Sequence, residues 1–293
     1  MKYIGMFINL AMGDPELEPN GRIKWFADGV NEIIRPDSWK FVPSVYGAGE
    51  YQNYQNLANA LVMSNPKPDL LFASCGQSLR ALQIALAQDK TRPIVYSGVA
   101  DPTNMDVFLP NYNVHGVTSY KLSKLLDGLK VLMDHSHDIQ SLRVIYDPKT
   151  RLGPAQLGFL VAGASLLSPP PAWYRSITDV QGISIRDPKL KDAIRSFAYS
   201  KGAYGGLFVT TTTYTAVQRH DLVKMVNEAE DDYAGFKAIF PNSLYRRSPD
   251  PMARARLSYG AITPKLYRRA GRIAGTILNG GMGYDEVNTT DFE

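Results

Sequence analysis

Cysteine and long apolar runs are what this sequence has least of. Cys75 is the single cysteine, which excludes an internal disulfide framework and a cysteine-based zinc site. A protein without disulfides is compatible with either side of a membrane, so the redox compartment stays open. No apolar run approaches the roughly 20 residues that a membrane-spanning helix needs. We therefore expect no direct insertion into a membrane.

A strong excess of one charge is also lacking. The 32 Lys and Arg residues against 28 Asp and Glu residues give a net charge of +4, spread along 293 residues. Nucleic-acid binding needs a basic patch or stripe, so we expect no nucleic-acid partner. Hydrophobic residues make up 44% of the chain, enough for substantial cores. At roughly 100–200 residues per domain, the length predicts two domains or one large one.

Recognised catalytic motifs are absent as well. The sequence contains no P-loop, no G-x-S-x-G, no H-E-x-x-H, and no G-x-G-x-x-G after a predicted strand. Cys75 falls at a predicted helix start, which favours a thiolate, but the sequence identifies no base beside it. His135 and His137 supply two of the four ligands that a zinc site needs. We predict no metal, no cofactor and no enzymatic activity.

Short apolar runs alternate with helical patterns along almost the whole chain. Apolar residues at helical spacing indicate a helix between most pairs of predicted strands; one example is Leu122, Leu125, Leu126 and Leu129. Strand–helix alternation predicts parallel sheets joined by right-handed crossovers, an α/β fold. The predicted strands are Lys2–Asn9, Lys40–Tyr46, Asp69–Ser74, Pro93–Ser97, Leu142–Asp147, Trp173–Thr178, Gly206–Thr211 and Lys237–Pro241.

The eight strands divide four and four around residue 118, which favours two α/β lobes. A single eight-stranded barrel has the same strand count and is the alternative. The tail argues against the barrel, because Leu257–Gly260, a further helix and a strand near Glu286–Phe292 exceed eight units.

The segment Ser74–Ser78 joins a predicted strand to a predicted helix. Free backbone N–H groups at a helix start favour a carboxylate or phosphate, and ligands bind at the carboxyl ends of strands in open α/β sheets. Several tyrosines also fall near strand ends, where they suit an aromatic or apolar ligand with polar ends. The basic residues of the Asn242–Leu257 loop are interpreted as a solvated surface, with anion binding as the alternative.

Three blocks of sequence resemble one family. Pro93–Pro102 (PIVYSGVADP) with Asn113–Thr118 (NVHGVT) resembles a "PIVF-x-x-V-x-DP … N-V-T-G-V" pattern. Ser258–Gly260 with Leu266–Ala270 and Ile277–Gly280 resembles an "SYG … LYRRAA … ILKG" close. The opening Ile4–Glu16 is similar to the same family's first strand and loop. The family is that of the TrpX-like substrate-binding proteins of ABC transporters, and the resemblance runs in order along the whole chain.

The resemblance implies a type I periplasmic-binding-protein fold, with two Rossmann-like lobes joined by three hinge crossings. The first lobe would hold residues 1–117 and about 259–282, and the second about 118–258 with 283–293. Members of the family bind amino acids, some of them aromatic, between the lobes.

The resemblance also implies where ligand contacts lie. They would follow strand ends of both lobes, with Tyr259 near a hinge. The implied ligand-binding residues are Asn9, Ser74, Gly76, Gln77, Ser78, Ser97, Gly98, Asp101, Thr118, Ser119, Tyr120, Tyr146, Asp147, Thr211, Thr212, Asn242 and Tyr259.

These features favour the solute-binding receptor of an ABC importer, with a small carboxylate-bearing ligand and an ABC permease as partners. Hinge closure around the ligand would create the shape that the permease binds. We expect a periplasmic or exported protein whose leader is not part of this sequence. The alternative is a cytoplasmic small-molecule sensor of the same fold, although no helix-turn-helix precedes the first strand, as a repressor would need. An enzyme that uses the cleft is a further alternative.

Overall fold

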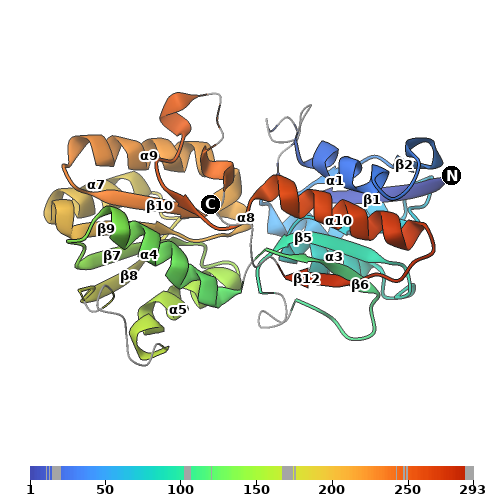
Figure 1. Cartoon of the computed structure of the whole chain (residues 1–293), viewed down its shortest axis with the longest axis horizontal. Coiled ribbons are helices and arrows are strands. Elements are labelled where there is room, and N and C mark those ends of the chain that lie inside the picture. The colour runs from blue at the N-terminus through green and yellow to red at the C-terminus, as the bar shows by residue number, and fades with distance from the viewer. Residues whose placement is uncertain are drawn as a thin grey trace. The chain divides into compact units, whose positions relative to one another are not determined.

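The computed structural model covers residues 1–293, and it describes all of them except 11, 13, 15–20, 102–106, 120, 167–173, 175, 242, 247, 249 and 288–293. The chain forms two compact units (Figure 1). Unit 1 consists of Met1–Tyr120 and Ile262–Asp291, and unit 2 consists of Lys121–Ala261 with Phe292–Glu293.

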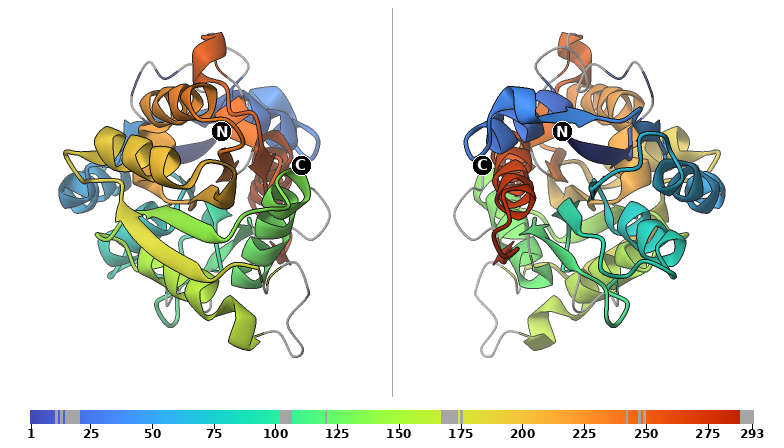
Figure 2. Two further views of the ribbon diagram at one scale, coloured as in Figure 1. Left: turned by 90° about the vertical axis from the view of Figure 1, so that its left-hand side faces the viewer. Right: turned by 90° about the vertical axis from the view of Figure 1, so that its right-hand side faces the viewer.

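Unit 1 contains a parallel sheet in the order β12-β6-β5-β4-β1-β2, with β3 also paired to β1. Its strands are β1 (Lys2–Ile8), β2 (Trp39–Phe41), β3 (Val45–Tyr46), β4 (Leu70–Ala73), β5 (Ile94–Val99), β6 (Val114–Thr118) and β12 (Asp285–Val287). Its helices are α1 (Arg22–Asn31), α2 (Tyr54–Val62), α3 (Gly76–Ala85) and α10 (Thr263–Leu278). The right-hand view of Figure 2 shows α1 and α10 on one side of the sheet and α2 and α3 on the other.

Helices α1 and α10 come from opposite ends of the sequence and lie side by side in unit 1 (Figures 1 and 2). Glycines make this close approach possible. A Cβ atom on Gly29 of α1 would collide with the Arg268 carbonyl of α10, and one on Gly271 would collide with the Phe26 carbonyl of α1. Across the same contact, Glu32 forms ion pairs with Arg268 and Arg272.

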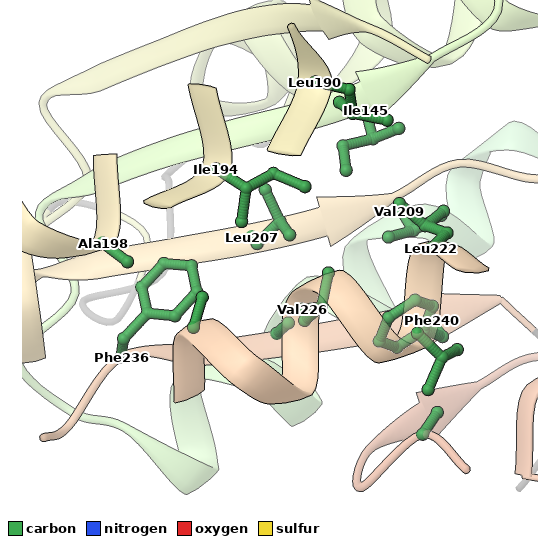
Figure 3. Close-up of a cluster of buried hydrophobic side chains, with 14 of the residues drawn as sticks. Ile145, Leu190, Ile194, Ala198, Leu207, Val209, Leu222, Val226, Phe236 and Phe240 are labelled. Atoms are coloured by element: carbon green, nitrogen blue, oxygen red, sulfur yellow. The ribbon is translucent and has the colours of Figure 1, made fainter. Parts of the chain in front are cut away.

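Unit 2 contains a second parallel sheet, in the order β11-β10-β9-β7-β8. Its strands are β7 (Ser141–Tyr146), β8 (Asp179–Ser184), β9 (Gly205–Val209), β10 (Lys237–Pro241) and β11 (Ser258–Tyr259). Its helices are α4 (Leu125–His135), α5 (Leu152–Leu166), α7 (Leu190–Lys201), α8 (Thr213–Val217) and α9 (Arg219–Asp232). Figure 3 shows the core where α7 and α9 pack on the sheet, with Ile194, Leu207, Val226 and Phe236 among its buried side chains.

The predicted α/β class with parallel sheets is confirmed, and the barrel alternative is wrong because the described strands form two separate sheets. One predicted strand is misplaced. Trp173–Thr178 does not form a strand over its described residues, and β8 follows it at Asp179–Ser184. Strand β6 was not among the eight predicted strands.

Over the described residues, the chain passes between the units near residues 120 and 261. Residues 283–293 were expected in the second lobe. For β12 that expectation is wrong, because β12 pairs with β6 through Asp285 and Gly116, inside the sheet of unit 1; residues 288–293 lie outside the described residues. The side chain of Asp285 also accepts a hydrogen bond from the Gly116 N–H at 3.0 Å.

The described helices include none with the length and apolar character needed to cross a lipid bilayer.

The close α1–α10 contact generates a stability prediction. Gly29→Ala adds a methyl group against the Arg268 carbonyl, and the backbones must move apart. Such overpacking costs about 1–3 kcal/mol of unfolding free energy. Gly158→Ala is the matched control, because this exposed glycine of α5 has nothing near the added methyl group. The control should gain about 0.5–1 kcal/mol from helix propensity. Urea unfolding followed by circular dichroism measures both, and equal stability of Gly29→Ala and wild type would contradict the described contact.

Buried Glu230 generates a pH prediction. Its carboxylate accepts a hydrogen bond from the Ala238 N–H at 2.9 Å, and burial raises the pKa of Glu230 above its usual value. In contrast, a hydrogen bond from Lys191 lowers the pKa of exposed Glu228. A raised carboxyl pKa means that the folded state loses stability as the pH rises from about 4.5 through the folded pKa.

Glu230→Gln should therefore become progressively more stable relative to wild type as the pH rises from 4 to 7. Glu228→Gln, the matched control on the same helix, should show the opposite trend, because its lowered pKa stabilises the folded state above the unfolded pKa. Melting temperatures of the wild type and of both variants, measured across this pH range, test these two trends. Parallel pH profiles for the two variants would show that burial does not govern Glu230.

Candidate functional site

The strand order places a topological switch point in each unit. In unit 1, β1 lies between β2 and β4. The chain therefore runs from β1 to a strand on one side of it and later returns to a strand on the other side. In unit 2, β7 lies between β8 and β9 in the same way. Ligands of open α/β sheets bind at the carboxyl ends of the strands at such points. The residues that follow these strands are Asn9 and Ser74 in unit 1, and Asp147 and Thr210 in unit 2.

Asn9 and Ser74 form a buried hydrogen-bonded pair. The Asn9 N–H donates to Ser74 Oγ at 2.7 Å, and Ser74 Oγ donates to Asn9 Oδ1 at 3.0 Å. The pair forms because β1 and β4 are parallel neighbours, with Phe7 opposite Ala73. The structure therefore brings together two residues that the sequence placed at separate strand ends.

A buried arginine completes this cluster. Arg22, the first residue of α1, donates from Nη1 to Asn9 Oδ1 at 2.7 Å and to the Tyr267 hydroxyl at 3.1 Å. Its guanidinium also lies 5.4 Å from the centroid of the Tyr267 ring, a cation–π contact. Burial raises the pKa of Tyr267, while the Arg22 charge acts in the opposite direction.

The start of α3 is occupied by its own cap. Cys75 Sγ accepts from the Ser78 N–H at 3.4 Å, and the Cys75 N–H donates to Ser78 Oγ at 3.1 Å. The fully buried Ser78 hydroxyl thus stabilises the helix. Gly76 and Gln77 lie in the first turn of α3 and are half-buried. Ligand contact at Ser74, Gly76, Gln77 and Ser78 remains a prediction.

The other predicted residues of unit 1 gather at the ends of β5 and β6. The register shifts between Ser97 and Val99, around Gly98 at φ +71°, and Asp101 also has a positive φ of +40°. A Cβ on Gly98 would lie 3.2 Å from the Ser74 carbonyl, which shows how near this bulge comes to the end of β4.

Two hydroxyl groups at this edge differ in their partners. Ser97 Oγ is fully buried and has no hydrogen-bond partner among the described residues. The Thr118 hydroxyl bonds the Tyr96 hydroxyl at 3.2 Å, and burial raises the pKa of Tyr96 to about 12. Ser119 continues the edge, with its N–H donating to the Val99 carbonyl at 2.9 Å.

An open groove of about 380 Å³ adjoins the carboxyl end of β1. Tyr46 pairs with Ile8, and the Gly47 N–H donates to the Ile8 carbonyl at 2.8 Å. The groove is lined by Tyr46, Gly47, Ala48, Glu50, Asn53, Asn56 and Leu57. Ala48 has a φ of +46°, a conformation that residues with a Cβ adopt at a cost.

The switch point of unit 2 contains a buried ion pair. Asp147 has a fully buried side chain and accepts from Arg186 Nε at 2.7 Å and Nη2 at 2.9 Å. The Arg186 guanidinium lies 3.7 Å from the centroid of the Tyr214 ring. Arg186 keeps 20% of its side chain exposed, so the arginine reaches solvent and the carboxylate does not.

The segment after β9 is held by side-chain hydrogen bonds. Gln156 donates to the Thr211 carbonyl at 2.8 Å and accepts from the Thr211 N–H at 2.9 Å. Thr212 caps α8 with Thr215. The Thr211 hydroxyl is buried without a partner among the described residues, which leaves a donor and an acceptor at this strand end.

The two predicted tyrosines described in unit 2 are the last residues of strands in its sheet. Tyr259, in β11, is buried and donates to the Val209 carbonyl at 3.3 Å, and its ring centroid lies 4.8 Å from that of Phe208. Tyr146 ends β7 and is half-buried. The predicted contacts Tyr120 and Asn242 lie outside the described residues.

Four residues of these clusters were missed in the sequence: Arg22, Tyr267, Gln156 and Arg186. Each lies on a helix or in a connection rather than at a predicted strand end, and arginine and glutamine are usually exposed. No sequence pattern marks them as buried.

The described residues contain no group of three or more His, Cys, Asp or Glu side chains placed to hold a metal ion. The basic residues of the 242–257 loop that the structure describes are largely engaged. Arg254 donates to the Ser248 carbonyl at 2.7 Å, and Arg256 pairs with Asp231 at 2.6 Å.

Comparison with known proteins finds no matching family model and no matching curated protein. Solved structures do match. A conserved domain protein from Vibrio cholerae is 16% identical with a TM-score of 0.74, and the match covers 99% of this chain and 90% of that one. An ABC domain from Streptococcus pneumoniae in complex with L-Trp gives 15% identity, a TM-score of 0.73 and the same coverage. An ABC transporter solute-binding protein from Bacillus halodurans with bound myo-inositol is 8% identical with a TM-score of 0.64, and the match covers 100% of this chain and 94% of that one.

The chain has the type I periplasmic-binding-protein fold. A periplasmic binding ribose operon repressor protein from Lactobacillus acidophilus shares it, at 13% identity, a TM-score of 0.59, and coverage of 100% of this chain and 96% of that one. The fold predicted from the sequence resemblance is thus confirmed, while the TrpX-like family is only weakly indicated at these identities.

The Asp147–Arg186 pair generates a prediction for this periplasmic-binding-protein fold. Asp147→Asn leaves the Arg186 charge without its carboxylate, and breaking a buried pair costs about 3 kcal/mol or more. Asp179→Asn is the control, because Asp179 pairs with Arg143 at 2.8 Å but is 33% exposed. The control should lose at most about 1 kcal/mol. Urea unfolding midpoints compare the two variants. An equal loss of unfolding free energy in both would mean that the Asp147–Arg186 pair stabilises the fold no more than the Asp179–Arg143 pair does.

Proposed function

We propose that the chain is the solute-binding receptor of an ABC importer. Its ligand would be a small carboxylate-bearing molecule, such as an amino acid with an aromatic or branched side chain. One observation carries the proposal: buried polar side-chain groups follow the strands at the switch point of each sheet. Asn9 and Ser74 supply these groups in unit 1, and Asp147 with Thr211 in unit 2.

The binding step that we propose uses both sets of strand ends. A ligand that contacts both units stabilises the conformation in which both reach it, by the difference in its affinity for the closed and open forms. The chain crossings near residues 120 and 261 are hinges in this proposal. An ABC permease would then bind the closed form, which requires a periplasmic or exported location.

The solved structures support the receptor class, since two of them are described as an ABC domain with L-Trp and a solute-binding protein with myo-inositol. The proposed ligand class takes its aromatic character from the first of these. We propose no catalytic role for the chain.

The cytoplasmic sensor is the second candidate, and the repressor of the same fold favours it. The gene upstream of Met1 distinguishes the two. An encoded leader would favour the receptor, and translation initiated at Met1 would favour the sensor.

A thermal-shift screen tests the receptor function. A ligand at about 100 times its Kd adds about 2.7 kcal/mol of stability, which raises the melting temperature by several degrees at roughly 2–4 °C per kcal/mol. The panel contains L-amino acids, aromatic acids and small peptides, and hits are checked by calorimetry. Mass spectrometry of the recovered ligand is the control for turnover. A hit that is chemically converted by the protein would contradict the receptor proposal.

A further inference from the structure

Arg22 is a buried cation with neutral hydrogen-bond partners. It is 3% exposed, and its hydrogen bonds are to the neutral groups of Asn9 and Tyr267. Among the described residues no acidic side chain pairs with it, and the first turn of α1 contains no acidic residue. Its Nε is fully buried and has no hydrogen-bond partner in the described part of the chain.

This arrangement is electrostatically unfavourable in the absence of an anion. A buried charge is costly unless it is paired and hydrogen-bonded. The position adds to the cost, because the N-terminus of a helix carries a partial positive charge that disfavours a cation. Arg92, in the same unit, shows the usual solution: it is also buried, but it donates to Asp89 from Nε at 2.9 Å and from Nη2 at 2.6 Å.

The surrounding hydrogen bonds also fix Asn9 in one orientation. Arg22 and Ser74 both donate to the same amide oxygen, Oδ1, so the Asn9 Nδ2, on the same amide group, takes part in neither hydrogen bond. Asn9 is 5% exposed, and its Nδ2 has no hydrogen bond to a described residue. A donor held in place beside an unneutralised guanidinium is suited to an anionic group.

We propose that Arg22 binds the carboxylate of the ligand and that Asn9 Nδ2 is the second donor to it. This inference rests on the proposed receptor function and assigns its anion-binding residue. It replaces the start of α3 as the carboxylate site, because the Ser78 N–H there is already capped by Cys75. Arg22 lies at the β1–β4 switch point, where the fold positions a ligand.

The competing source of negative charge is the chain itself, in the segment before α1, which contains Glu16 and Glu18. If one of these acids neutralised Arg22, the arginine would be a structural residue. Stability measurements separate the two cases, because an internal partner stabilises the ligand-free protein and an external ligand does not.

The first experiment compares ligand-free melting temperatures. Arg22→Met replaces the charge with an apolar side chain of similar length and leaves no buried charge behind. We expect it to melt at or above the wild-type temperature. Arg92→Met is the matched control and should melt lower, because it removes both hydrogen bonds from Arg92 to Asp89 and leaves Asp89 with its longer contact to Lys67 at 3.5 Å. The double variant Glu16→Gln, Glu18→Gln should melt as wild type does.

The second experiment measures binding to matched probes by calorimetry. L-tryptophan is paired with tryptamine, benzoate with benzamide, and myo-inositol is the neutral probe. We expect wild type to bind the carboxylates and not their uncharged or decarboxylated partners. Arg22→Met should weaken carboxylate binding about ten- to hundredfold, as loss of a charged hydrogen bond does. Arg22→Gln, which keeps a donor without the charge, should weaken it similarly, and Arg92→Met should leave it unchanged.

Three results would overturn the Arg22 assignment while leaving the receptor function standing. These are tight wild-type binding of tryptamine, benzamide or myo-inositol; wild-type affinity for the carboxylates in Arg22→Met; and a common drop in melting temperature in Arg22→Met and the acidic double variant. Failure of wild type to bind any probe would count against the receptor proposal. Even then, a common drop in melting temperature would overturn the Arg22 assignment.

Discussion

Parallel pairing between β1 and β4 in unit 1, and between β7 and β9 in unit 2, is the constraint on which the candidate site depends. Each pairing aligns two strand ends that are far apart in sequence, so the residues after those strands meet. Asn9 meets Ser74 in this way, and the Thr210 N–H bonds the last-but-one carbonyl of β7, that of Ile145, at 2.9 Å. A slip of register in either pair would move these polar groups apart and would turn apolar strand residues out of the cores.

The sequence predicts strands that are buried on both faces well, because these strands are continuous apolar runs. It fails where a strand is half exposed or interrupted. Strand β8 lies at the edge of its sheet and has the partly polar sequence DVQGIS, whereas the preceding WYRSIT is richer in aromatic and β-branched residues and imitates a strand. In β6, His115 and Gly116 break the apolar run. The place of β12 beside β6 is a tertiary contact that no local pattern contains.

The residues of the candidate site also fall into those that the sequence marks and those that it does not. Strand-end reasoning points to Ser74, and the family resemblance implies Asn9 and Asp147, at the carboxyl ends that a parallel sheet brings to one edge. It does not find Arg22 or Arg186, whose burial is decided by what packs around them. The two arginines then differ in a manner that only coordinates reveal: Arg186 has a buried carboxylate partner, and Arg22 has neutral ones. A binding site that holds polar groups ready for a ligand commonly costs the free protein stability.

The pairing of α1 with α10 also has a consequence for the order in which the protein is made. Unit 2 is an insertion between two pieces of unit 1, and the helix that covers Gly29 lies after that insertion. All the strands and helices of unit 2 have been synthesised before α10 leaves the ribosome, whereas the β1–α1 layer of unit 1 must wait for it. During synthesis at about 5–20 residues per second, unit 1 therefore presents an uncovered face of α1 for on the order of ten seconds or more. The synthesis of the last helix is the step that ends this exposure.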